Sequence, residues 1–158
     1  MEEIVKKKLK KISLVCAVFA FFTMLVFAIL FLDFFKVRTL KTVTLLALSS
    51  ANIAEEYKNI LELKEIRSPN YLIFPATFEG TLSNNKTIIL SFARLTGKYG
   101  VYQGLFLYDK SRGRTELCAI IADDYKKPPS LYGINDFIIQ YWKDKIALAF
   151  AATAATAS

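Results

Sequence analysis

Few side chains in this chain of 158 residues could perform chemistry. The chain has no histidine, the residue that most often serves as general base and metal ligand. It has two cysteines, Cys16 and Cys118, which are too few for a disulfide scaffold or a four-thiolate metal site. A nucleophilic thiol at Cys118 would need a basic partner, and no histidine can serve. We therefore expect both cysteines to be small buried hydrophobic residues.

The carboxylates form no recognisable catalytic pattern either. Asp123 and Asp124 are adjacent, so on a strand they would point to opposite faces and could not share a substrate or a metal ion. We predict a non-enzymatic protein with no cofactor and no metal site. The other candidate acids are isolated in the sequence: Glu79, Glu116, Asp136 and Asp144.

Glycines at positions 97, 100 and 104 suggest a phosphate-binding loop at first sight. They lack the G-x-x-x-x-G-K-[ST] order and a following helix, so this match fails. We expect them to mark a tight turn and a bulge or a close backbone approach.

The elements that must position these side chains begin with a membrane segment. Residues 12–32 form a run of 21 residues without a charge, which as a helix would be about 31 Å long, close to the ~30 Å of a bilayer core. A buried core helix would rarely be apolar on all sides, and the apolar region of a signal peptide has only about 7–15 residues. We predict an uncleaved transmembrane helix over residues 12–35 that follows a basic segment, residues 1–11.

Positive charge is unequal on the two sides of this helix. Five lysines precede it, and Lys36, Arg38 and Lys41 follow it. This bias favours an N-terminus in the cytoplasm or the mitochondrial matrix, in a bacterial or mitochondrial inner membrane. The rest of the chain would then face the periplasm or the intermembrane space. The expected anchors at the membrane interface are Lys10, Lys11, Lys36 and Arg38.

Residues 36–66 contain neither proline nor glycine and are predicted to be a helical connector. Apolar side chains at helical spacing indicate a helix over residues 52–65. Residues 67–150 are rich in β-branched and aromatic residues separated by turn signals. The fold class is therefore α+β, with the transmembrane helix followed by a small antiparallel β-meander and the 52–65 helix packed on one face. The predicted strands are 71–74, 76–79, 87–92, 100–108 and 115–121, followed by a hairpin of 136–142 and 145–150, and we assign no function to the low-complexity tail 151–158.

Basic residues flank two of the predicted turns. Residues 36–158 contain 16 basic and 11 acidic side chains, a net charge of +5. Two interpretations fit Lys98, Lys110, Arg112 and Arg114. They form either a plain solvated surface or a patch that could bind anionic lipid head groups or an acidic protein partner. A membrane-anchored external domain seldom meets nucleic acid, so we expect no nucleic-acid partner.

The order of these features resembles a known group of membrane proteins. The chain combines one membrane helix, Phe78-Glu-Gly80, and the stretch Phe92-Ala-Arg-Leu-Thr-Gly-Lys-Tyr-Gly-Val-Tyr102 leading into a basic hairpin. Over residues 12–122 it is similar to small single-pass proteins of the mitochondrial inner membrane that assist cytochrome oxidase assembly or presequence translocation. The tryptophan expected after the Gly113 turn is absent. The resemblance implies an α+β domain that works by docking.

Two functional interpretations follow. The first is a non-enzymatic accessory subunit or assembly factor, whose partners are other membrane protein subunits and the lipid bilayer. The second is a membrane-tethered module that binds a lipid, a peptide or a cell-envelope ligand. The second interpretation predicts an apolar pocket or an open edge strand on the external domain.

Overall fold

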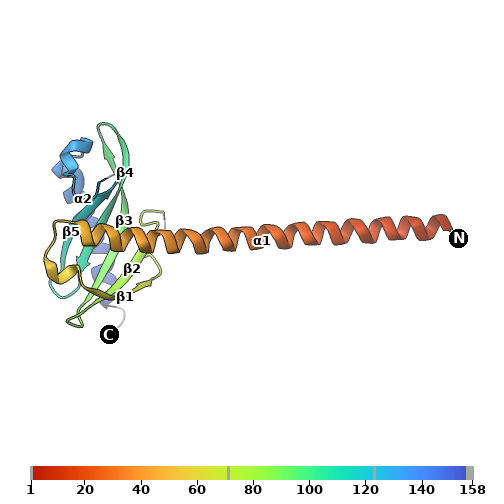
Figure 1. Cartoon of the computed structure of the whole chain (residues 1–158), viewed down its shortest axis with the longest axis horizontal. Coiled ribbons are helices and arrows are strands. Elements are labelled where there is room, and N and C mark those ends of the chain that lie inside the picture. Colours follow the sequence, from red (N-terminus) through yellow and green to blue (C-terminus); the bar gives the residue numbers. More distant parts are fainter. Residues whose placement is uncertain (1, 71, 123, 156–158) are drawn as a thin grey trace. The chain divides into compact units, whose positions relative to one another are not determined.

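The protein combines two helices with one five-stranded sheet (Figure 1). The computed structural model describes residues 2–70, 72–122 and 124–155, but not the side chains of 2–15, 33, 34, 37 and 152–155. The chain divides into two units, Met1–Thr39 and Leu40–Ser158. The elements are α1 (Glu2–Ser50), a 3-10 turn (Glu55–Tyr57), β1 (Ile60–Glu65), β2 (Thr77–Leu82), β3 (Thr87–Gly97), β4 (Gly100–Asp109), β5 (Arg114–Ile121), a second 3-10 turn (Pro129–Tyr132) and α2 (Asp136–Ala155).

Residues 12–35 all belong to α1. Every side chain from 16 to 32 is exposed, including Phe19, Phe27 and Leu32. Among the residues that the structure describes, no helix is both long and apolar enough to cross a membrane. The start of the predicted segment, residues 12–15, lies outside the described side chains.

The sheet is an antiparallel meander in the order β1-β2-β3-β4-β5, which confirms the predicted antiparallel α+β class. Its longest hairpin joins β3 and β4, where Gly97 pairs with Gly100 across a two-residue turn. A side chain at Gly97 would come within 2.2 Å of the carbonyl oxygen of Tyr132, so only glycine fits this contact. The expected tight turn and close backbone approach are both present. The pairing of β4 with β5 shifts register between Leu105 and Phe106, where Cys118 of β5 is the extra residue.

Helix α2 packs on one face of this sheet. Ile146 and Phe150 of α2 are buried in one cluster with Ile89, Phe106 and Ile120 of the strands. The predicted hairpin of 136–142 and 145–150 is therefore wrong, although its β-branched and aromatic residues fit a strand. The side chain of Asn135 accepts a hydrogen bond from the backbone N–H of Ile138 at 2.9 Å and so caps the helix that the sequence analysis missed.

The opposite face of the sheet is covered by the last turns of α1, which belong to the same unit as the sheet (Figure 1). Thr44, Ala47 and Leu48 of α1 are buried, as are Leu90 and Phe92 on the side of β3 that faces away from α2. Because both faces are covered, six consecutive residues of β3 are fully or nearly buried. This explains the continuous apolar run in β3.

The predicted helix over residues 52–65 is also wrong. The chain leaves α1 at Ser50, and residues 60–65 form the edge strand β1, antiparallel to β2. The sequence Ile-Leu-Glu-Leu-Lys-Glu has good local helix propensity, but pairing with β2 and burial of Leu63 outweigh it. The predicted strand 71–74 is not formed at its described residues 72–74, where Leu72 is exposed and Phe74 enters the core under α2.

One buried hydroxyl in the sheet has no hydrogen-bond partner among the described residues. Thr115 of β5 is buried and its Oγ1 makes no hydrogen bond, which costs free energy. We expect Thr115→Val to raise the free energy of unfolding by about 1 kcal/mol. Thermal unfolding of the full chain in mild detergent would show a melting temperature about 3 °C higher.

Thr77 of β2 provides the matched control for this substitution. It is also buried, but its Oγ1 lies 3.3 Å from Oγ of Ser91 and is hydrogen-bonded to it. Thr77→Val should therefore lower the melting temperature, because Ser91 loses its partner. Equal shifts for the two variants would show that the hydroxyl of Thr115 carries no cost.

Candidate functional site

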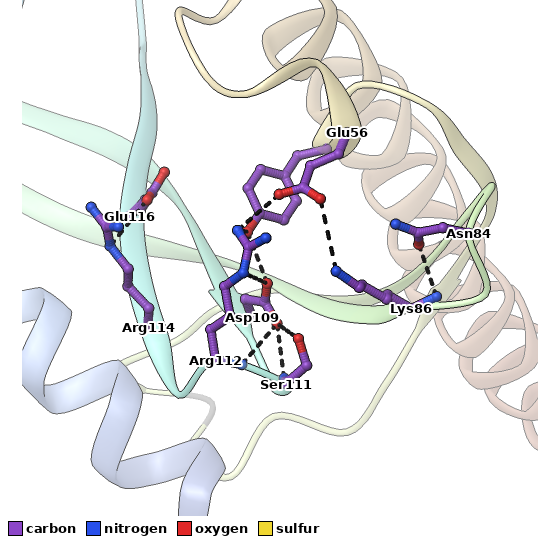
Figure 2. Close-up of polar contacts among 9 residues, drawn as sticks. Glu56, Asn84, Lys86, Asp109, Ser111, Arg112, Arg114 and Glu116 are labelled. Carbon is purple, nitrogen blue, oxygen red and sulfur yellow. Dashed lines mark hydrogen bonds and ion pairs between the residues drawn. The ribbon is translucent and has the colours of Figure 1, made fainter.

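A buried tyrosine and a buried aspartate meet at the β4–β5 hairpin (Figure 2). Tyr57, from the turn that follows α1, donates a hydrogen bond of 2.8 Å to Oδ2 of Asp109 at the end of β4. Both side chains are at least 95% buried, with exposed fractions of 4% and 2%. Burial, together with the neighbouring Asp109 carboxylate, raises the pKa of Tyr57 to about 12. The hydroxyl is therefore a fixed donor at neutral pH and not a base.

Asp109 also organises the hairpin turn itself. Its Oδ1 accepts hydrogen bonds from the backbone N–H of Ser111 at 2.8 Å, from the Ser111 hydroxyl at 2.6 Å and from the N–H of Arg112 at 3.2 Å. Burial by itself raises the pKa of a carboxyl group, but hydrogen bonds from Ser111, Tyr57 and the backbone of Ser111 and Arg112 outweigh it and lower the pKa of Asp109. Asp109 is thus an ionised acceptor with all its partners in place.

Arg112 closes this group of residues on the solvent side. Its Nη1 donates to the hydroxyl of Tyr57 at 2.9 Å and forms an ion pair of 2.8 Å with Oε1 of Glu56. The bond to Glu56 raises the pKa of Arg112. Lys86, from the β2–β3 hairpin, lies 3.8 Å from Oε2 of the same glutamate. The group ties two hairpins to the segment after α1 and presents no unpaired acid, base or nucleophile.

The four basic residues predicted to form one patch do not lie together. Lys110, Arg112 and Arg114 belong to the β4–β5 hairpin, whereas Lys98 lies at the β3–β4 hairpin. The length of β4 separates the two turns, roughly 30 Å at the rise of a strand. Lys110 forms an ion pair with Glu79 at 2.8 Å and Arg114 one with Glu116 at 3.2 Å. The basic hairpin is therefore largely neutralised by acids.

The expected anchors at the membrane interface are only partly within the described residues. Lys36 and Arg38 have exposed side chains in α1. The side chains of Lys10 and Lys11 lie outside the described residues. Among the described residues, no group of acids or cysteines is arranged to hold a metal ion.

The two cysteines have different environments. Cys118 is buried in β5, as expected, and burial followed by the charge of Glu116 raises the pKa of its thiol. A thiol held in this way is a poor nucleophile at neutral pH. Cys16 is exposed in α1, so the expectation that it is buried is wrong for the chain by itself.

The clefts in the described part of the domain include one along β5 and one beside the start of β2. One of about 210 Å³ follows the edge strand β5, between Leu117–Ile120 and the segment Tyr125–Pro129. The other, of about 400 Å³, lies where Glu65–Pro69 meets Pro75–Thr77. The first has Lys126 and Lys127 on its wall, and its floor is an edge strand whose outer side pairs with no other strand. It could take an extended segment of another chain by strand addition.

Comparison with known proteins gives one match. The model of a family described as "Uncharacterised protein" matches residues 41–156. The chain belongs to this family. The matched residues of this uncharacterised family coincide with the unit that contains the sheet and α2. No curated protein and no solved structure matches the chain.

The group of residues around Asp109 was missed by sequence reasoning. Tyr57 and Asp109 are 52 positions apart, and neither lies in a recognisable motif. The local signal is the sequence Asp109-Lys-Ser-Arg-Gly113, whose residue types favour the turn that joins β4 and β5. Sequence reasoning also missed the cleft along β5, since the segment that forms its wall follows β5 through an irregular loop.

Proposed function

We propose that the protein is a non-enzymatic, single-pass membrane protein that acts as an accessory subunit or assembly factor of a larger membrane complex. Residues 12–35 would be its anchor and the family domain, residues 41–156, its docking module. Lys10 and Lys11 on one side and Lys36 and Arg38 on the other would lie at the two membrane interfaces. The N-terminus would face the cytoplasm or the mitochondrial matrix.

The observation that carries the proposal is the exposed apolar surface of α1. Every side chain between residues 16 and 32 is exposed, and Phe19, Met24 and Phe27 are each more than 70% exposed. Removing each bulky apolar side chain from water contributes about 1.5–3 kcal/mol, so a helix covered with them is stable only inside an apolar phase or against a partner. The uncharged run 12–32 is long enough for a bilayer core.

The domain itself supports docking more than chemistry. In its best-connected polar group each charged side chain faces an opposite charge or a hydrogen-bond donor, as described for Asp109 and Arg112. Such a group rigidifies a fold, whereas a catalytic site keeps a reactive side chain accessible in a cleft. The resemblance to single-pass assembly proteins is consistent with this proposal.

The anchor is tested by placing a charge in the middle of the apolar run. Val26→Arg should shift the full chain from the membrane pellet to the supernatant after alkaline extraction, because an arginine at the centre of a bilayer costs about 2.5–3.5 kcal/mol. Leu72→Arg, at a position that is 94% exposed in the domain, is the control and should leave the chain in the membrane. Recovery of the unaltered chain in the supernatant would contradict the proposal that residues 12–35 anchor the protein in the membrane.

The docking role is tested by purifying the tagged full chain in mild detergent and identifying what accompanies it. Stoichiometric membrane subunits would support an accessory role and identify the complex. A chain that purifies alone from intact membranes would contradict it. The second candidate, a membrane-tethered binding module, is favoured by the cleft along β5, and a peptide or lipid retained through purification would support it.

A further inference from the structure

One end of the domain carries bulky apolar side chains on its surface. Tyr99 and Val101, at the β3–β4 hairpin, are 67% and 62% exposed. Leu131 is 61% exposed in the turn before α2, and Phe137 is 79% exposed in the first turn of α2. We call these four residues and Lys98 the tip patch.

The tip patch is held together by backbone contacts between its two segments. The N–H of Lys98 donates a hydrogen bond of 3.1 Å to the carbonyl oxygen of Gly133. A side chain at Gly133 would come within 2.4 Å of Cβ of Lys98, and the rings of Tyr102 and Tyr132 are 4.8 Å apart. Figure 1 shows the hairpin beside the segment that leads into α2. The exposed side chains are therefore parts of one rigid surface.

Charge distinguishes this end of the sheet from the other. At the β4–β5 hairpin, Lys110 and Arg112 form ion pairs with Glu79 and Glu56. At the tip, Lys98 forms no ion pair among the described residues, and its Nζ lies 5.6 Å from the centre of the Tyr99 ring. The basic side chains nearest the tip in sequence are likewise unpaired among the described residues: Arg94, Lys126 and Lys127.

We propose that the tip patch docks on an anionic lipid surface, with Tyr99, Val101, Leu131 and Phe137 entering the interfacial region and Lys98 meeting the head groups. Protein surfaces that bind at a membrane interface typically combine tyrosine, phenylalanine and leucine with lysine. The tip patch has this composition. The proposal rests on the proposed anchor, since a tethered domain meets the bilayer at high effective concentration.

A lipid surface fits the tip better than a protein partner does. The bulky side chains project from a hairpin turn and a helix start, and none of them lines either the cleft along β5 or the cleft at Glu65–Pro69. The ammonium group of Lys98 beside the projecting apolar side chains complements head-group phosphates, and each lysine near an anionic surface strengthens binding about fivefold.

The test uses the full chain in vesicles of phosphatidylcholine, with or without phosphatidylserine. A fluorophore is attached at Leu131→Cys in a Cys16→Ala background, where the remaining thiol, Cys118, is buried. A nitroxide on the lipid head groups quenches the fluorophore only when the tip is docked, so the quenched fraction gives the docking constant. The control fluorophore is attached at Leu148→Cys, which is 75% exposed on α2 and outside the tip.

We expect strong quenching at position 131 in the anionic vesicles, weaker quenching without phosphatidylserine, and little at position 148. Lys98→Gln should lower the docking constant about fivefold, and Tyr99→Ser about tenfold. Lys110→Gln, whose lysine is paired with Glu79, should leave it unchanged.

Equal quenching at positions 131 and 148 in the same samples would overturn the inference, as would an unchanged constant for Lys98→Gln. Flotation of the vesicles in alkaline carbonate separates this failure from failure of the anchor. A chain that floats without quenching at position 131 keeps its anchor and refutes tip docking. A chain that does not float refutes the anchor, and quenching at position 131 by the added vesicles still decides whether the tip binds lipid.

Discussion

Asp109→Ala should lower the free energy of unfolding by about 3 kcal/mol, because it leaves one buried donor and two part-buried donors without their acceptor. The donors are the hydroxyl of Tyr57 and the N–H groups of Ser111 and Arg112. Urea unfolding of the full chain in mild detergent, followed by the fluorescence of Trp142, would measure the loss. Trp142 is the only tryptophan and packs 6.1 Å from the ring of Phe74 in the core.

The matched control for this prediction is Asp124→Ala. Asp124 also accepts a backbone hydrogen bond two residues ahead, from Lys126 at 2.9 Å, but it is exposed. Its replacement should cost less than about 0.5 kcal/mol. Similar losses for the two variants would mean that Asp109 contributes only a local turn and that its bond to Tyr57 adds nothing.

Lowering the pH should remove the stability that the Asp109 carboxylate contributes to the folded protein. The pKa of Asp109 is lowered in the folded protein, so the carboxylate contributes stability that is fully present above the unfolded pKa of about 3.9. This contribution is lost as the pH falls through the folded value. Asp109→Asn should therefore flatten the dependence of unfolding free energy on pH below about pH 4.

The sheet could be predicted because its signals are local. Turn residues separate strands of β-branched and aromatic residues, and hairpins pair neighbours in sequence. Two of the wrongly predicted elements, residues 52–65 and 136–150, have the opposite character. Their propensities contradict their final structures, and what decides between helix and strand is contact with the sheet: pairing with β2 in the first case and burial of Ile146 and Phe150 in the second.

The candidate site was harder to predict than the sheet, because it depends on contacts between residues that are far apart in the sequence. The sequence showed that Lys98 and Lys110 lie near turns, but only the register of β4 places those turns at opposite ends of the sheet. Ion pairing then gives the two ends different characters, because Glu79 neutralises Lys110 and no described acid pairs with Lys98. A count of net charge cannot make this distinction, since partners far apart in the sequence decide which cations remain available.

Phe150→Ala should be the most destabilising single substitution proposed for the domain, with a loss of about 3–5 kcal/mol. The ring is 2% exposed and lies 5.9 Å from that of Phe74 and 6.3 Å from that of Tyr108. Leu148→Ala, at a side chain that is 75% exposed, should change stability by less than about 0.5 kcal/mol in the same urea titration.

This pair of variants also decides between the helix and the hairpin that the sequence suggested. Residues two apart share one face of a strand, so in a hairpin both substitutions would remove buried contacts or neither would. In a helix the same residues lie about 200° apart around the axis, so one is buried and the other exposed. A large loss of unfolding free energy for Phe150→Ala with none for Leu148→Ala is thus expected only if these residues form α2. Comparable losses for the two variants would favour the hairpin.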